Sequence, residues 1–350
     1  MASIELSDRE RQVLEAVIRS YVETAEPAGS RTIARRFGLG VSPATIRNTM
    51  ADLEEKGFLF HPHTSAGRIP TDKAYRVYVD GLMHVEPLLT PDHERLTVEI
   101  GASGTGGSPI ETILRRAAQS LGILTQELGI ALGPRLDQTI LQRLELVRLA
   151  SDRMMLMLSL RGGAVRTIFI EIRGEIADEA IAEVQVVLNE RLAGHSLAEI
   201  RATLGSRLRD VSPPGGATEL LNIFLQEGEQ FFDVPGSPEE ESVLLGQASV
   251  LADKPEFSSG ESMKRLLTLT ETRSQLAALL RGRTSSPGVS ITIGDEHGSQ
   301  LLGGLTLVTA EYKAGGLTGV IGVIGPTRMP YEKVISLVTH TSSLVTDLLA

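Results

Sequence analysis

SPATIRNTMADLEEKG, residues 42–57, carries the signals of a complete helix with its own start and end. Ser42 followed by Pro43 is the order favoured at an N-cap and the first helical position. Gly57 is the residue type favoured just beyond a helix C-terminus. Apolar residues recur between these signals at spacings of four and three, which predicts one buried stripe: Ile46, Met50 and Leu53.

The opposite side of this helix carries small and hydrogen-bonding residues: Ala44, Arg47, Asn48 and Ala51. Arg can bond guanine and Asn can bond adenine with two hydrogen bonds each, and small residues allow close approach to the bases. This face therefore suits a helix that lies in the major groove of DNA. Taken alone, the segment fits an ordinary, well-capped surface helix equally well, so the flanking segments must decide.

Two further helices are predicted upstream of this segment. Ser7 and Glu10 have the spacing of a capping box at the start of the first. Ser30 begins a short second helix, RTIARRF, whose three arginines face outward. Gly38-Leu39-Gly40 then forms a tight connection to residues 42–57. Two helices joined by a short glycine-containing turn, the second with polar outward residues, are typical of a helix-turn-helix.

A short hairpin is predicted directly after this helix. Residues 58–60 (FLF) favour a strand, HPHTSAG (61–67) favours a turn, and residues 68–70 (RIP) favour a return strand. A hairpin behind a recognition helix is typical of a wing, and its polar tip would contact phosphates or a minor groove. His61 and His63 invite a metal site, but no third or fourth ligand lies near them in the sequence, so we expect none.

Charge is unevenly distributed along the chain. The whole chain of 350 residues has a net charge of −10, yet residues 1–85 hold 11 Lys/Arg and 11 Asp/Glu. Residues 28–76 hold 8 Lys/Arg against 4 Asp/Glu, a local excess of +4. A basic segment on an acidic body can still bind a phosphate backbone, while the body limits non-specific binding.

Several classes of protein and site are disfavoured. There is no cysteine, which excludes disulfides, thiolate metal sites and a cysteine nucleophile. No apolar run approaches the ~20 residues of a membrane span, and the N-terminus lacks the basic region of a signal peptide. No catalytic motif is present, and GASGTGG lacks the Gly-Lys-Ser/Thr of a phosphate loop. We therefore expect a cytoplasmic protein with no catalytic residues, metal or cofactor.

The remainder of the chain reads as a mixed α+β body. A Pro- and Gly-rich linker region surrounds a short helix, and strands in a meander follow at 141–172. Residues 195–283 are mostly helical, and strands resume at 289. Strand and helix segments on both sides of a helical block predict one α+β domain interrupted by an insertion.

Two segments resemble a known family. The run GSRTIARRFGLGVSPATIRNTMADLEEKGFLFHPHTSAGRIPTDKAYRVYVD closely resembles the N-terminal domain of HrcA, a family of bacterial heat-inducible transcription repressors. It includes the tail HTSAGRIPTDKAYR, which generic winged helices lack. A second segment, GVIGVIGPTRMPYEKVI (319–335), also resembles the family and stands in the expected order.

The resemblance implies a multidomain α+β chain. Its expected parts are a winged helix-turn-helix DNA-binding domain at 1–85, a linker region at 86–107, a GAF-like domain at 108–194 and 284–350, and an inserted, mainly helical dimerisation domain at 195–283. It also implies a homodimer that binds an inverted-repeat operator in double-stranded DNA and represses chaperone operons of the DnaK and GroE type. Heat would release the operator, GroE chaperonin would be a partner, and no membrane would be involved.

The residues of the first segment suggest individual roles in DNA binding. Ser42 and Thr45 would bond phosphates at the helix N-terminus, where free N–H groups also point. Arg47 and Asn48 would bond base edges, and Arg31 and Arg68 would hold the backbone on either side. The full set of expected DNA-binding residues is Arg31, Thr32, Ser42, Ala44, Thr45, Arg47, Asn48, Ser65 and Arg68.

Three alternatives stay open from sequence alone. The first is a transcriptional regulator gated by a small molecule in the GAF-like domain, for which ligand-dependent melting would be the discriminating observation. The second is an enzyme fused to a DNA-binding domain, which the missing catalytic motifs disfavour. The third is a winged helix used only for protein contacts, which the local excess of positive charge disfavours.

Overall fold

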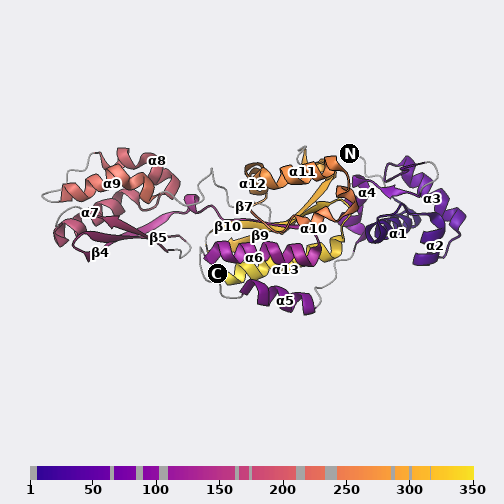
Figure 1. The fold of residues 1–350 in the computed structure, drawn as a ribbon, viewed down its shortest axis with the longest axis horizontal. Coiled ribbons are helices and arrows are strands. Elements are labelled where there is room, and N and C mark those ends of the chain that lie inside the picture. The colour runs from indigo at the N-terminus through magenta and orange to yellow at the C-terminus, as the bar shows by residue number, and fades with distance from the viewer. Residues whose placement is uncertain are drawn as a thin grey trace. The chain divides into compact units, whose positions relative to one another are not determined.

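The computed structural model describes residues 6–63, 67–83, 90–101, 109–161, 165–172, 176–209, 217–232, 243–284, 288–298, 302–315 and 317–350. The chain divides into two compact units (Figure 1). The first comprises Met1–Ala131, Val243–Glu311 and Val320–Val345, and the second comprises Leu132–Ser242, Tyr312–Gly319 and Thr346–Ala350.

The first unit begins with three helices and a hairpin. These are α1 (Asp8–Thr24), α2 (Ser30–Phe37), α3 (Pro43–Glu55), β1 (Leu59–Phe60) and β2 (Ile69–Pro70), followed by α4 (Asp72–Val77) and the π-helical turn η1 (Tyr78–Leu82). The expected capping box is present, because Ser7 and Glu10 bond each other's backbone N–H groups. The expected stripe of α3 is buried and so is the apolar face of α1, and the two helices are in contact: Ile46, Met50 and Leu53 on α3, and Val13, Leu14, Val17 and Ile18 on α1.

A five-stranded sheet lies in the rest of the first unit, apart from residues 312–319, which cluster with the second unit. Its strands are ordered β7 (Val243–Leu245), β3 (Leu128–Leu132), β10 (Leu317–Pro326), β9 (Leu305–Ala314) and β8 (Val289–Ile293). The helices α6 (Pro109–Thr125) and α13 (Tyr331–Leu348) cover one face, and α5 (Thr90–Gly101) packs on α6. The helices α11 (Gly260–Glu271) and α12 (Arg273–Arg281) lie over the other face, after the short helix α10 (Ser249–Ala252) (Figure 1).

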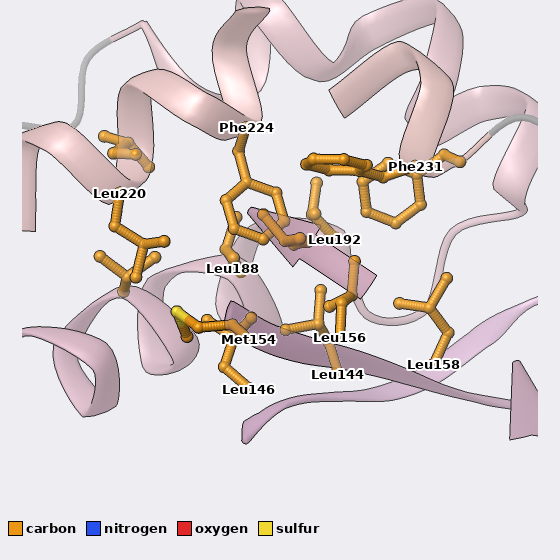
Figure 2. Close-up of a cluster of buried hydrophobic side chains, with 14 of the residues drawn as sticks. Leu144, Leu146, Met154, Leu156, Leu158, Leu188, Leu192, Leu220, Phe224 and Phe231 are labelled. Carbon is orange, nitrogen blue, oxygen red and sulfur yellow. The ribbon is translucent and has the colours of Figure 1, made fainter. Parts of the chain in front are cut away.

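The second unit has its own small antiparallel sheet, with three helices packed beside it. The antiparallel strands β4 (Leu141–Ala150), β5 (Arg153–Leu160) and β6 (Val165–Glu171) lie beside α7 (Asp178–Leu192), α8 (Leu197–Leu208) and α9 (Ala217–Phe231). Figure 2 shows leucines of β4 and β5 facing Phe224 and Phe231 of α9 and Leu188 and Leu192 of α7. Burial of these large side chains on one face is the main source of stability for such a layer.

The edge of this small sheet is bonded to α7 by side-chain amides. Asn189 accepts a hydrogen bond from the Leu144 N–H at 2.8 Å and donates one to the Leu144 carbonyl at 2.7 Å. Gln185 accepts from the Leu146 N–H at 2.8 Å. Unpaired edge strands can associate with other strands, and these two amides pair three backbone groups of β4.

The compact units have other limits than the domains expected from sequence, which stay a prediction. The meander was placed with the first part of the GAF-like domain (108–194), yet β4–β6 form a sheet of their own with α7–α9. Residues 243–283, expected within the insertion at 195–283, belong to the first unit instead. The reason is physical: alternation of apolar residues identifies a strand, but it does not specify which sheet the strand joins.

Candidate nucleic-acid interface

The connection between α2 and α3 depends on two glycines. Gly38 and Gly40 have φ angles of 57° and 70°, which lie in the left-handed region that other residues adopt at a cost. Ser42 then adopts an extended conformation and starts α3, with Pro43 at the first helical position. The predicted short turn between two helices is therefore present in the structure.

The N-terminus of α3 is closed by hydroxyl groups. Ser42 Oγ accepts a hydrogen bond from the Thr45 N–H at 3.1 Å, and the two hydroxyl oxygens are 2.9 Å apart. Such a cap is worth about 1 kcal/mol of helix stability. Both hydroxyls thus have a structural role at the end of α3, and Ser42 remains exposed to solvent.

The outward face of α3 presents the expected side chains. Ala44, Arg47 and Asn48 are exposed, Thr45 is half-buried, and the stripe on the opposite face is fully enclosed. Arg31 and Thr32 are exposed on α2. The structure therefore places these predicted residues on the surface of α2 and α3.

Half of the cations in residues 28–76 form ion pairs within the protein. Arg36, Lys56, Arg68 and Arg76 bond Glu23, Glu10, Glu54 and Glu296, respectively. Among the described residues, no ion pair or side-chain hydrogen bond engages the exposed guanidinium groups of Arg31, Arg35 and Arg47. These three groups carry positive charge on α2 and α3 that phosphates can neutralise. Arg35 was missing from the predicted set, although its outward position on α2 could have identified it.

Arg68 is held against α3 rather than presented to solvent. Its Nε and Nη2 atoms lie 3.0 and 2.8 Å from Glu54 Oε2, and its side chain is 13% exposed. His61 Nδ1 lies 2.7 Å from the other oxygen of Glu54. Burial acts to raise the pKa of Glu54, but the hydrogen bonds and charges of His61 and Arg68 outweigh it and lower the pKa. Arg68 thus fastens the hairpin to α3, a role that the sequence did not reveal.

The same return strand is bonded to the loop before α2. The backbones of Ala28 and Arg68 exchange hydrogen bonds of 2.9 and 3.0 Å. A Cβ atom on Gly67 would lie only 2.4 Å from the Ala28 carbonyl oxygen, so this close approach requires glycine. Ser65, predicted at the tip of the hairpin, lies outside the described residues.

A pocket of about 460 Å³ also lies in the first unit. It is lined by α1, η1 and the start of α13: Glu15, Arg19, Val22, Glu23, Tyr78, Met83, Met329, Pro330 and Glu332. Within the described residues, no three His, Cys, Asp or Glu side chains are arranged to hold a metal ion. None of the described helices is long and apolar enough to cross a membrane.

A family model described as the HrcA protein C terminal domain matches residues 111–335, more than half of the chain. The chain belongs to the HrcA family. The heat-inducible transcription repressor HrcA of Chlorobium chlorochromatii (strain CaD3) is 38% identical over 99% of this chain and 98% of its own length. That of Chlorobium limicola is 39% identical over 100% and 99%, and that of Geobacter sulfurreducens is 38% identical over 99% and 98%.

A solved structure supports the fold of this HrcA family member. The crystal structure of a hypothetical protein covers 99% of both chains with a TM-score of 0.61 at 21% sequence identity. This similarity concerns the fold alone. The family resemblance inferred from the two sequence segments is confirmed by the full-length relatives.

Proposed function

We propose that this chain is a heat-inducible transcriptional repressor that binds operator DNA through α3 and releases it on heat shock. The observation that carries the proposal is the exposed face of α3, where Arg47 and Asn48 stand beside small residues on a helix whose other face is buried. The full-length relatives are named heat-inducible transcription repressors, which favours this function over a metabolite-gated regulator or an enzyme.

The fold elements fit the roles that the family resemblance implies. The helices α1–α3 with the hairpin β1–β2 serve as the winged helix-turn-helix. The five-stranded sheet with its helices serves as the GAF-like domain, and the compact unit at 132–242 serves as the inserted dimerisation domain. A repressor must reach its operator, so its location is the cytoplasm.

The DNA contacts follow from the geometry of α2 and α3. With α3 in the major groove, Arg47 bonds guanine and Asn48 bonds adenine, while Ala44 permits the close approach. Arg31, Arg35 and Thr32 of α2 meet the phosphate backbone, joined by Ser42 and Thr45 at the positive end of α3. Ser65 extends the contact from the hairpin, and Arg68 sets the position of that hairpin.

A homodimer supplies the second copy of α3 that an inverted repeat requires. The outer face of β4–β6 supports this assignment, because Val147 pairs with Met155 and Met155 pairs with Phe169 across the three strands. Phe169 is 69% exposed and Val165 is 59% exposed, although both belong to regular strands. Two such apolar faces can cover each other in a symmetric contact.

The targets and regulation are those of the family resemblance: chaperone operons of the DnaK and GroE type, with GroE chaperonin as a partner that maintains the active form. Heat acts either on the packing of this chain or through the supply of free chaperonin. Binding at fixed temperature with and without GroE separates these two routes.

Substitution of Arg47 tests the proposed base contact. Arg47→Ala should lose roughly 1–3 kcal/mol of binding free energy on the operator, and most of that loss should be absent on random duplex DNA. The matched control is Arg95→Ala, which removes an exposed arginine of α5 in the same unit. Equal losses on operator and random DNA would show that Arg47 contacts only the phosphate backbone.

A further inference from the structure

The helix-turn-helix elements and the five-stranded sheet belong to one compact unit, and a defined set of polar contacts joins them. The contacts arise from α4 and η1, directly after the hairpin, and from the end of α1. We call them the coupling contacts. They comprise Asp72 with Asp295, Arg76 with Glu296, Tyr78 with Glu332, and Arg328 with Val22.

Arg76 makes the most extensive of the coupling contacts. Its Nε donates to Glu296 Oε1 at 2.8 Å, and its Nη2 donates both to the other oxygen of Glu296 and to the Ile291 carbonyl at 2.8 Å. A planar guanidinium held at two carboxylate oxygens and a strand carbonyl has a fixed orientation. The hydrogen bond from Arg76 is also the main cause that lowers the pKa of Glu296.

Asp72 is held by the backbone turn at Gly294–Asp295, which directly follows β8. We call the five-stranded sheet with its helices the sheet domain. Its carboxylate accepts a hydrogen bond from the Asp295 N–H at 3.1 Å. The preceding residue, Gly294, has a φ angle of 53°, and a Cβ atom there would lie 1.7 Å from Asp72 Oδ2. The turn therefore has a glycine at the position where the carboxylate of Asp72 needs space.

Tyr78 makes the third coupling contact, and an aromatic pair accompanies it. The Tyr78 hydroxyl donates to Glu332 Oε1 at the start of α13. Tyr75 is buried, and its ring centroid lies 5.8 Å from that of Tyr331. Aromatic pairs at such distances add stability beyond their buried area.

Arg328 makes the fourth coupling contact, from the segment before α13 to the end of α1. Its Nη1 donates at 2.9 Å to the carbonyl of Val22, in the last turn of α1, where carbonyls lack helical partners. Its Nε and Nη2 lie 2.5 and 3.1 Å from the two carboxylate oxygens of Glu256. Arg328 thus caps α1 while Glu256 holds the guanidinium in place.

The coupling contacts coincide with the two segments that carry the family resemblance. Asp72 and Arg76 belong to the tail of the first segment, and Tyr78 lies two residues beyond that tail in the same segment. Arg328 and Glu332 belong to the second segment. None of the five lies on α2 or α3. These five residues therefore do not belong to the helices proposed to contact DNA. Their contacts instead join α1, α4 and η1 to the five-stranded sheet and its helices.

We propose that Arg76, Asp72 and Arg328 are positioning residues that fix the DNA-binding elements on the sheet domain, and so help to set the half-site spacing that the dimer accepts. The inference rests on the proposed function as a dimeric repressor. Linking two DNA-binding elements raises the affinity for an operator only when both elements can bind their half-sites at the same time. A loose attachment would leave the affinity of each element unchanged but weaken the joint binding.

The test compares full-length wild type with Glu296→Gln, which removes the carboxylate from the sheet side and leaves α4 intact. The control is Glu111→Gln, which breaks an exposed ion pair of α6 in the same unit. Each protein is titrated with an operator of native spacing, with operators lengthened or shortened by one and two base pairs, and with a single half-site.

Glu296→Gln should lose about tenfold in affinity for the native operator, keep wild-type affinity for the single half-site, and discriminate less between spacings. Glu111→Gln should behave as wild type. The double variant Arg76→Glu with Glu296→Arg, which restores an ion pair, should recover part of the spacing preference.

Unchanged affinity and spacing preference in Glu296→Gln would overturn the proposal. Equal losses on the single half-site and the operator would also overturn it, because the contacts would then support the fold of the DNA-binding elements rather than their position. If wild type bound the operator no better than a shuffled duplex, the proposed function itself would fail. That result is distinguishable, because it appears before any substitution is made.

Discussion

At the scale of single residues, Glu10 shows how one side chain can serve both local and long-range structure. It completes the capping box of α1 and also bonds Lys56 Nζ, just past α3, at 2.6 Å. The hydrogen bond from Lys56, together with those from Ser7, lowers the pKa of Glu10 below its ordinary value of 4.5. The C-terminal end of α3 is therefore tied to the start of α1 by an ionised carboxylate.

The stability contributed by Glu10 should depend on pH. Because its pKa is lower in the folded state, the contribution is complete above pH 4.5 and is lost as the pH falls through the folded pKa. Glu10→Gln should therefore lower the free energy of local unfolding by roughly 0.5–1 kcal/mol at pH 7, and less at pH 4. Hydrogen exchange of the α1 amides measures this difference.

Glu15→Gln is the control for this prediction, because Glu15 lies on the same helix in an exposed pair with Arg19. A difference between wild type and Glu10→Gln that stays constant from pH 7 to pH 3 would contradict the assignment. The effect would then come from the shape of the side chain rather than its charge.

At the scale of elements, the hairpin behind α3 changes the role expected for Arg68. Sequence predicted a free arginine at the DNA backbone, whereas the structure pairs it with Glu54 on α3. The two roles lead to opposite results for Glu54→Gln. If Arg68 contacts phosphates, loss of the competing carboxylate should strengthen DNA binding. If it fastens the hairpin, the same change should weaken binding.

We expect Glu54→Gln to weaken operator binding several-fold, with little change in the salt dependence, because the number of phosphate contacts is unaltered. Glu55→Gln, one position later and exposed, removes the same charge without touching the hairpin and serves as the control. Filter binding over a range of salt concentrations gives both quantities. Stronger binding by Glu54→Gln would contradict this role and support a direct contact of Arg68 with DNA phosphates.

Sequence predicted the elements around α3 well because their signals are local. Ser42 and Pro43 start the helix, Gly38 and Gly40 supply left-handed conformations, and these features act within a few residues. The association of β4–β6 into a sheet of their own could not be predicted in this way. Nor could the pairing of Arg68 with Glu54, since it depends on how the hairpin folds back on α3.

At the scale of the whole molecule, the proposed dimer depends on the outer face of β4–β6. Phe169→Glu places a charge at the β6 end of the apolar row Val147–Met155–Phe169 and should convert the dimer into a monomer, because a buried unpaired carboxylate is costly. Val186→Glu, on an exposed position of α7, is the control. Sedimentation equilibrium of both variants measures the change. A dimer that tolerates Phe169→Glu would place the interface elsewhere.

The measurement that tests the central claim most directly is binding of the purified protein to a duplex with the inverted repeat and to a shuffled duplex of equal composition. It is made at one salt concentration, at a low temperature and at a heat-shock temperature. The account predicts tight binding that prefers the repeat at low temperature, and loss of that preference on heating or on removal of GroE. Equal affinity for the two duplexes at every temperature, with and without GroE, would contradict it.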